Sequence, residues 1–371
     1  MFQYIYPLGY LHFIDLILFL LIITSQRSVI FLDINTISLT SLTLEDLHLS
    51  HLLPNYTIKF DRNGTVADNI YKYLSSRQGF IQHKRHIKAP KDKVNSYQQT
   101  FRELVLKGAP IVLFFSSFSP KVTNPKVTNQ QLLPDMGDLL TLVHLHLLAK
   151  EVRSFYDYGF RFIIGYRGYL YQPILRWDIE TVDQTFTILH ELIKHAERIT
   201  GVRNIIEFVD FVELTKREGD YFESQWEAEK TKVRNLYLDD DEYMERKISG
   251  WLRDFKQSIN PIDFSDTKDF HSYMLNQAFS IRALKQVQFR GGEKDSGICN
   301  SLPPSVQTSV RGLDPELSIQ LNPYFRYHAH QRLLGLNQLT GKWETFKWIE
   351  KAHVAEPITT NEYNYPFYYK I

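Results

Sequence analysis

Three short apolar runs, alternating with helical patterns, limit the folds that this chain can adopt. The runs cover residues 111–115, 160–164 and 205–211, and Gly, Pro or polar residues bound them. Runs of this length and setting are typical of strands buried on both faces of a parallel sheet. Between them, residues 135–155 and 181–200 carry apolar side chains at helical spacing. The alternation predicts an α/β fold with a Rossmann-like sheet covered by helices.

The two helical patterns have polar or small residues at their ends that suit helix termini. Asp135 opens the first helix, and Asp138 follows in its first turn, where a carboxylate complements the helix dipole. Thr181 and Gln184 have the spacing of a capping box, which predicts that the second helix begins there. Gly201 is placed where a helix commonly ends.

The remaining segments are expected to complete an elaborated α/β domain. Residues 169–171 indicate an extension or a partner of the second strand. Residues 215–258 are rich in charge and predict one or two exposed helices, and residues 268–290 predict another. The C-terminal part is expected to be rich in strands, which include residues 317–321 and 343–350.

No clear linker divides the chain, so we expect one catalytic-type domain. Its expected bounds are residues 65–350, with an N-terminal extension at 1–60 and a C-terminal tail at 351–371. The extension contains an apolar run at 16–23, which is shorter than the roughly 20 residues that cross a bilayer. No Lys or Arg precedes Arg27, although a secretory signal begins with a basic region. We therefore expect a cytoplasmic protein without membrane association.

The apolar run near the N-terminus also fits a cleaved signal, a buried helix or a start codon placed too far upstream. Asn55 and Asn63 begin Asn-x-Thr sequons, which matter only in a secreted chain. A secreted or membrane-associated protein is therefore a separate hypothesis, which glycosidase-sensitive mobility or cofractionation with membranes would support.

Composition argues against several classes of function. The chain has 43 Lys and Arg against 42 Asp and Glu, and its net charge of +1 does not favour nucleic acid as a partner. The single cysteine, Cys299, excludes an internal disulfide and a multi-cysteine metal site. The sequence lacks the signatures of dinucleotide, P-loop, zinc-protease and serine-hydrolase sites. Those common functions therefore have no direct support.

The order of motifs in residues 109–175 narrows the choice of protein family. An apolar strand leads into Phe118–Asn124, which contains Lys121, and then into a Lys-Val pair at 126–127. Leu133–Asp138 follow as Leu-Pro-Asp-Met-Gly-Asp at the start of the leucine-rich helix. This order of motifs resembles the pyoverdine/dityrosine biosynthesis family, the isocyanide (isonitrile) synthases. The Leu-Pro-Asp helix with the lysine loop before it is the most specific part of the resemblance.

Later segments fall in the order that the same family has. They are the strands at 204–208 and 317–321 and an aromatic–His pair, Tyr327 and His328. The likeness covers roughly residues 65–350.

The resemblance implies that the chain condenses the amine of an aromatic amino acid, tyrosine or tryptophan, with the C2 carbonyl of ribulose 5-phosphate. The amino group would be converted to an isonitrile. The product would serve secondary metabolism or the formation of spore-wall dityrosine. An imine route needs a general acid or base, a phosphate clamp and an aromatic pocket. The resemblance implies a transferase or lyase that needs no metal or cofactor. An oxygenase or a cytochrome P450 would take the product.

On that resemblance, Asp135 and His328 are the candidate catalytic residues, since both can exchange a proton. Lys121 and Lys126 lie on a polar loop after a strand, where α/β sheets place ligands, and could hold the phosphate. Structural roles stay open for each of these residues. Asp135 also suits a helix N-cap, the lysines suit a solvated loop, and His328 lies among aromatic residues that suggest a core.

Arg167, Asp138 and Tyr169 are candidate substrate-binding residues. Arg167 stands where the family has the acid of an Asp-Gly turn, and it could bind a phosphate or carboxylate or lie on a surface turn. Asp138 also suits a first-turn carboxylate that complements the helix dipole. Tyr169 is expected to line an aromatic pocket, with a core position as the alternative.

Two departures from the family's pattern favour a different class of function. Arg167 removes a carboxylate, and Asn300–Pro304 stand where the family has Arg-Leu-Ser-Ile-His, which removes a histidine. The alternative hypothesis is a divergent, catalytically silent paralogue that acts as a binding or scaffold protein. Binding of a phosphosugar separates the two hypotheses.

Overall fold

The fold is described from a computed structural model of the chain. It describes residues 36–47, 65–76, 99, 101–118, 120–121, 125–129, 131–175, 177–218, 220–239, 267–290, 306–309, 317–318 and 332–371. The apolar run at 16–23, the two sequons, Cys299, Asn300–Pro304 and the Tyr327–His328 pair lie outside these residues.

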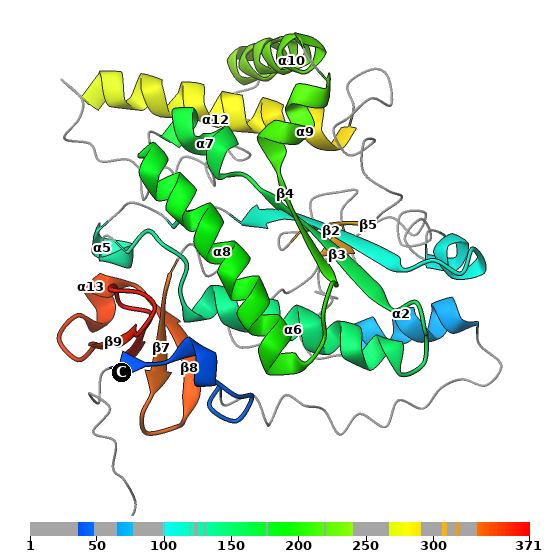
Figure 1. The fold of residues 1–371 in the computed structure, drawn as a ribbon. Helices are drawn as coiled ribbons and strands as arrows, with labels where there is room; N and C mark the ends of the chain where they lie inside the picture. The colour runs from blue at the N-terminus through cyan, green and yellow to red at the C-terminus, as the bar shows by residue number, and fades with distance from the viewer. Residues whose placement is uncertain are drawn as a thin grey trace, which may run out of the picture.

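A parallel five-stranded sheet forms the centre of the molecule (Figure 1). Its strands are β2 (Ile111–Phe118), β3 (Phe160–Tyr166), β4 (Ile206–Asp210), β5 (Val306–Ser309) and β6 (Leu317–Ser318), in the order β4-β3-β2-β5-β6. The chain builds outward from β2 to β4 on one side and then crosses to β5 on the other. The strand order therefore reverses between β2 and β5, and open α/β sheets bind ligands beside such a point. The predicted α/β fold with a Rossmann-like sheet is confirmed.

The apolar runs form strands because both faces of the sheet are covered. Residues 111–115 of β2 pair with residues 160–164 of β3, and Phe162 pairs with Ile206 of β4. The paired residues of β2 are buried, as are all of those of β3 except Arg161. Continuous apolar sequence is what a parallel strand between two layers of helices requires.

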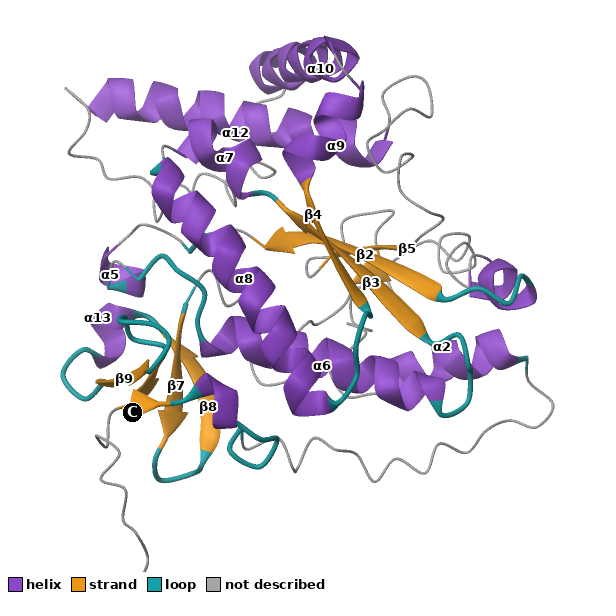
Figure 2. Cartoon of the chain, viewed as in Figure 1, coloured by secondary structure: helices purple, strands orange, loops and turns teal. Residues whose placement is uncertain are grey.

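Helix α6 (Met136–Arg153) is the most enclosed helix that the structure describes. Every residue from Met136 to Ala149 is buried, because the sheet, helix α8 (Ile179–Thr200) and the C-terminal strands surround it. A helix that is buried on all sides must have other elements packed around it in this way. Figure 2 shows α8 beside the central strands, with its lower end passing in front of α6.

Two expectations about local structure near β3 and α8 are wrong. Residues 169–171 belong to helix α7 (Gly168–Leu175) and not to a strand, because strand pairing ends where Tyr166 meets Phe118 and Asp210. The N-cap of α8 is Asp178, so Thr181 already lies within the helix and starts no capping box.

The end of α8 is as predicted. Gly201 adopts a left-handed φ of 71° and its N–H donates to the carbonyl oxygen of Glu197 at 2.9 Å. A helix that ends this way favours glycine, because a Cβ is unfavourable at positive φ.

A helical layer covers the carboxyl end of the sheet (Figure 1). Helices α7 and α9 (Phe211–Glu218) directly follow β3 and β4, and α10 (Asp220–Asp239) packs beside α12 (Thr267–Arg290). Helix α12 confirms the helix expected at 268–290. Further helical elements include α2 (Val66–Ser76), α5 (Pro125–Thr128) and a single turn, η1 (Leu39–Ser41).

A second, mixed sheet lies at the N-terminal end of α6 (Figure 2). Its order is β1-β9-β10-β7-β8, and its strands are β1 (Thr36–Ile37), β7 (Leu333–Asn337), β8 (Lys342–Phe346), β9 (Glu356–Thr360) and β10 (Tyr368–Lys370). The strand expected at 343–350 ends at Phe346, and a helical turn, α13 (Trp348–Lys351), follows.

Residues 351–371, set apart as a tail on sequence grounds, contain two strands of this sheet. The side chain of Phe367 is 0% exposed and belongs to the main hydrophobic core. The segment pairs with β1 through Thr36 and Thr359, so residues from both ends of the described chain lie side by side. Among the described residues, no helix has the length and apolarity needed to cross a membrane.

Candidate active site

The lysine loop places a buried cation just beyond the carboxyl end of β2. The Lys121 N–H donates to the carbonyl oxygen of Leu132 at 2.9 Å, which folds the loop back onto the chain before α6. The Lys121 side chain is only 1% exposed. Its Nζ lies 3.0 Å from Oδ2 of Asp135 and 3.7 Å from Oδ2 of Asp138. We call these three residues the Lys–Asp–Asp cluster.

Both aspartates of the cluster also cap helix α6. Oδ1 of Asp135 accepts the N–H of Gly137 at 2.8 Å, and Oδ2 of Asp138 accepts the N–H of Asp135 at 3.0 Å. This reciprocal pattern is a capping box with aspartate at both positions. The structural role considered for Asp135 is thus present, together with an ion pair to Lys121 that sequence reasoning did not foresee.

Burial sets the ionisation of Asp135. Loss of solvent raises its pKa from 3.8 to about 6, and Asp138 adds to the rise, although Lys121 and the N–H of Gly137 oppose it. A carboxyl group with a pKa near 6 can both give and take a proton near neutral pH. Perturbed carboxyl groups of this kind are common at functional sites.

The C-terminal segment fastens the turn that carries Asp135. The Tyr365 hydroxyl donates to the carbonyl oxygen of Pro134 at 2.8 Å, and the Met136 N–H donates to the carbonyl oxygen of Phe367 at 2.9 Å. Sequence reasoning missed Tyr365. The one available signal was the density of aromatic residues at 363–369, which does not indicate a partner more than two hundred positions away.

Arg167 follows β3 and is buried, not on a surface turn. Its side chain is 6% exposed, and its backbone N–H donates to the carbonyl oxygen of Phe118, the last residue of β2. The Nη1 group donates to the Tyr171 hydroxyl at 2.9 Å. The guanidinium carbon lies 5.4 Å from the ring centre of Phe211 and 5.7 Å from that of Tyr171. Arg167 and the cluster therefore follow adjacent strands at the same end of the sheet.

The other predicted residues lie elsewhere. Tyr169 is half-buried on α7, and its hydroxyl donates to Asp183 of α8 at 2.8 Å. Its ring packs against Tyr166 and Phe186, which places it in an aromatic cluster below α8. Lys126 is exposed on α5, in contrast to Lys121. His328 lies outside the described residues.

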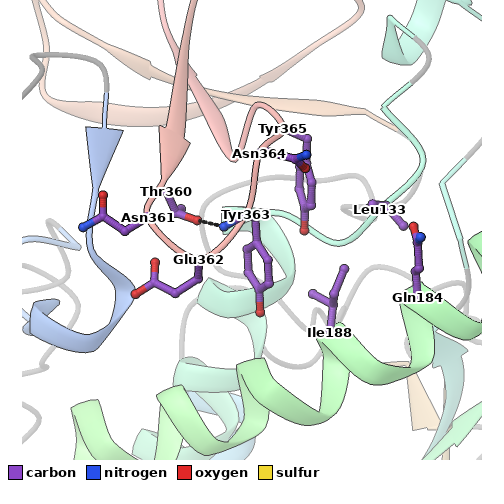
Figure 3. Close-up of a pocket in the computed structure, with 9 residues that line it drawn as sticks. All are labelled: Leu133, Gln184, Ile188, Thr360, Asn361, Glu362, Tyr363, Asn364 and Tyr365. Carbon is purple, nitrogen blue, oxygen red and sulfur yellow. Dashed lines mark hydrogen bonds between the residues drawn. The ribbon is translucent and has the colours of Figure 1, made fainter.

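A groove of 530 Å³ borders the Asp135 turn on one side (Figure 3). Helix α8 forms one wall and the loop between β9 and β10 forms the other. The lining residues are Leu133, Gln184, Ile188, Thr360, Asn361, Glu362, Tyr363, Asn364 and Tyr365. None of the predicted site residues is among them. Tyr365 is the link between the groove and the turn, because its hydroxyl reaches Pro134.

The described residues hold no group of three or more His, Cys, Asp or Glu side chains that could bind a metal ion. The cluster itself offers two carboxylates, and Lys121 occupies the space between them.

The fold and the cluster together define a class of protein. A parallel sheet with buried ionisable groups where the strand order reverses is typical of α/β proteins that act on small molecules. Within that class, the chain belongs to the pyoverdine/dityrosine biosynthesis family, whose sequence profile matches residues 87–280, more than half of the chain. This match contains the whole cluster and Arg167.

One curated protein is similar in sequence, and one solved structure is similar in fold. The L-tyrosine isonitrile synthase of Xenorhabdus nematophila is 24% identical over 163 residues, which are 44% of this chain and 48% of that enzyme. The alignment thus spans about half the length of that relative. The crystal structure of the PvcA protein from Pseudomonas aeruginosa superposes with a TM-score of 0.63 at 14% identity, over 83% of this chain and 100% of that chain. At that identity the superposition shows a shared fold.

Proposed function

We propose that this chain is an isonitrile synthase-type enzyme that acts on an aromatic amino acid and a phosphosugar, ribulose 5-phosphate. The observation that carries the proposal is the buried Lys–Asp–Asp cluster beyond β2. It is built from the lysine loop and the Leu-Pro-Asp helix, which are the motifs that resemble the family most specifically. The matching family profile and the tyrosine-specific relative support the same choice.

In the proposed reaction, the amine of the amino acid attacks the C2 carbonyl of the sugar phosphate. The carbinolamine that forms loses water to give an imine, so one group must protonate the leaving hydroxyl and one must accept the ammonium proton. The bonds from C2 to C1 and C3 must then both break: one electron pair stays on C2 as the isonitrile lone pair, and the other leaves with its sugar fragment, which takes up a proton. Asp135 suits both tasks in turn, because its pKa of about 6 leaves both forms populated near neutral pH. Lys121 holds the carboxylate form by its charge, rather than serving as a free phosphate ligand.

Arg167 is proposed to bind the anionic end of a substrate. Its planar guanidinium matches a carboxylate or a phosphate, and the rings of Phe211 and Tyr171 beside it suit an aromatic side chain. The isonitrile would then pass to an oxygenase or a cytochrome P450, in the formation of a secondary metabolite or of dityrosine.

The test is direct detection of the product. The full chain is incubated with tyrosine or tryptophan and with ribulose 5-phosphate that carries ¹³C at C2. Mass spectrometry should find an isonitrile with the label, and Asp135→Asn should lower its rate by about 10²-fold or more, as expected for loss of an acid–base group. Asp157→Asn makes the same change at an exposed carboxylate and should leave the rate unchanged.

A second measurement distinguishes the enzyme from a catalytically silent paralogue. The silent paralogue is the hypothesis favoured by Arg167, which stands where the family has an acid. A ligand that binds only the folded state raises the thermal midpoint. A midpoint that rises with the sugar phosphate, without any labelled isonitrile, would indicate a binding protein. No rise at millimolar ligand and no product would reject the proposed function.

A further inference from the structure

Two tyrosines in one loop hold two different parts of the molecule. The rings of Tyr363 and Tyr365 are stacked, with centres 5.4 Å apart and planes 13° apart. Tyr363 donates to Oε2 of Glu191 on α8 at 2.7 Å, whereas Tyr365 donates to the carbonyl oxygen of Pro134. Figure 3 shows both rings reaching from the same loop into the groove.

The bond from Tyr365 falls at a residue that has a single backbone group for hydrogen bonding. Pro134 has no N–H, so its carbonyl is the only backbone group through which that residue can form a hydrogen bond. Two residues later, Met136 is bonded to Phe367. Asp135 therefore lies between two positions that the same C-terminal segment fastens.

We propose that Tyr365 is a positioning residue for Asp135, and that the C-terminal sheet is thereby part of the active site. The hydroxyl of Tyr365 fixes the Pro134 carbonyl, and this keeps the Asp135 carboxyl in contact with Lys121. The catalytic consequence rests on the proposed function, whereas the positioning itself does not.

Several ionisable groups of the described chain act on this carboxyl. Lys121 faces it from the loop after β2, Asp138 from α6, and Tyr365 and Tyr369 from the C-terminal segment. Glu191 of α8 acts on Tyr365. Lys121 is the one cation among them, so a change in the distance between Lys121 and Asp135 should dominate any change in the pKa of Asp135.

The two tyrosines provide a matched pair of variants. Tyr365→Phe removes the hydroxyl and keeps the ring, so Asp135 stays buried while its turn loosens away from Lys121. Its pKa should then rise by about one unit, the size of one weakened charge contact. Tyr363→Phe removes the same group from the neighbouring ring and releases α8 instead, so the pKa of Asp135 should stay at its wild-type value.

The measurement is an NMR titration of the full chain labelled with ¹³C in the aspartate carboxyl groups. The signal of Asp135 is the one missing from Asp135→Asn. Hydrogen exchange of a peptide covering residues 132–140 supplies a second readout, which should speed up in Tyr365→Phe alone. In an active enzyme, Tyr365→Phe should also lower kcat about tenfold with little change in KM and move the acid limb of the pH profile upward.

An unchanged pKa in Tyr365→Phe, or an equal shift in both variants, would overturn the inference. A fall toward 3.8 would also overturn it, because Tyr365 would then act by excluding water. So would unfolding of Tyr365→Phe under conditions where Tyr363→Phe stays folded. A wild-type protein that makes no isonitrile would reject the proposed function alone, since the titration does not depend on turnover.

Discussion

At the scale of single residues, the Asp135 carboxyl couples the ionic state of the site to the stability of the fold. Its pKa rises from 3.8 to about 6 on folding, so the folded protein holds this proton more tightly than the unfolded chain does. The stabilisation of the fold by this bound proton is complete below pH 3.8, the pKa in the unfolded chain. It is lost as the pH rises through about 6, the pKa in the folded protein. Relative to Asp135→Asn, the wild type should lose on the order of 3 kcal/mol of unfolding free energy over that range.

Urea denaturation of both proteins at several pH values measures this difference. The slope with pH is the readout, because a constant offset between the two proteins also contains the loss of the ion pair to Lys121. Parallel curves for the wild type and the variant would contradict the raised pKa of Asp135.

Lys121 should be far more important for stability than Lys126, the next lysine along the chain. Lys121→Met leaves two buried carboxylates without their cation, and removing one partner of a buried pair costs about 3–5 kcal/mol. Lys126→Met makes the same change at an exposed position and should cost less than about 0.5 kcal/mol. The midpoint of chemical denaturation at neutral pH gives both values. Similar losses would contradict the difference in burial between the two lysines.

The sequence motifs selected residues that lie together in the Lys–Asp–Asp cluster. They did not predict the contacts that these residues make. Asp135, Asp138 and Lys121 belong to adjacent motifs, so local sequence was sufficient to select them. Their ion pairs depend on how the loop folds back onto Leu132, which no local pattern encodes. The burial of Arg167 likewise depends on Phe211, the first residue of α9, which follows another strand.

At the scale of elements, the end of α8 offers a test that involves no packing. A Cβ added at Gly201 would meet no heavy atom within 4 Å, so the only penalty for Gly201→Ala is the left-handed φ of 71°. The expected cost is about 1 kcal/mol. Thermal denaturation followed by circular dichroism measures it. A neutral effect would mean that α8 ends differently in solution.

Gly165 of β3 provides the contrasting case. A Cβ there would lie 2.1 Å from Cε2 of Phe211, and the position has no positive φ. Gly165→Ala should therefore act through packing, cost about 1–3 kcal/mol, and displace the ring beside Arg167. A loss no larger than that of Gly201→Ala would argue against this close contact.

The strands and long helices were predictable because their apolar periodicity is local. Helix α7 was not, because the tyrosines at 169 and 171 favour a strand by propensity alone. The neighbouring strands decide where β3 ends, at the pairings of Tyr166 with Phe118 and Asp210. The start of α8 was missed for a similar reason, since Thr181 has good capping chemistry but lies one turn inside the helix.

At the scale of the whole molecule, the main hydrophobic core reaches both sheets, and a smaller cluster of Leu333, Phe346 and Tyr369 lies in the C-terminal sheet. Phe367 from the C-terminal segment belongs to the same cluster of buried side chains as the residues of β2 and β3. Phe367→Ala should lower the unfolding free energy by about 3–5 kcal/mol while unfolding stays a single transition. Leu339→Ser, at a hairpin position that is 97% exposed, should change it by less than about 0.5 kcal/mol.

Near- and far-ultraviolet circular dichroism during urea denaturation check this prediction. Separate transitions for the wild type would mean that the two sheets unfold independently. The sequence predicted the parallel sheet, but it did not predict that the C-terminal sheet shares its hydrophobic core. The pairing of β1 with β9 joins residues more than three hundred positions apart, and such contacts have no periodic signal.

The bond between Tyr365 and Pro134 has a consequence for the order in which the protein is made. The two residues are 231 positions apart. A ribosome that adds about 5–20 residues per second needs roughly 10–50 s to cover that interval. During this time the nascent chain carries α6 without the segment that covers its first turn, although residues 136–149 of α6 are all buried in the complete fold. The Asp135 turn therefore matures late in synthesis, and until then a chaperone would have to shield the first turn of α6.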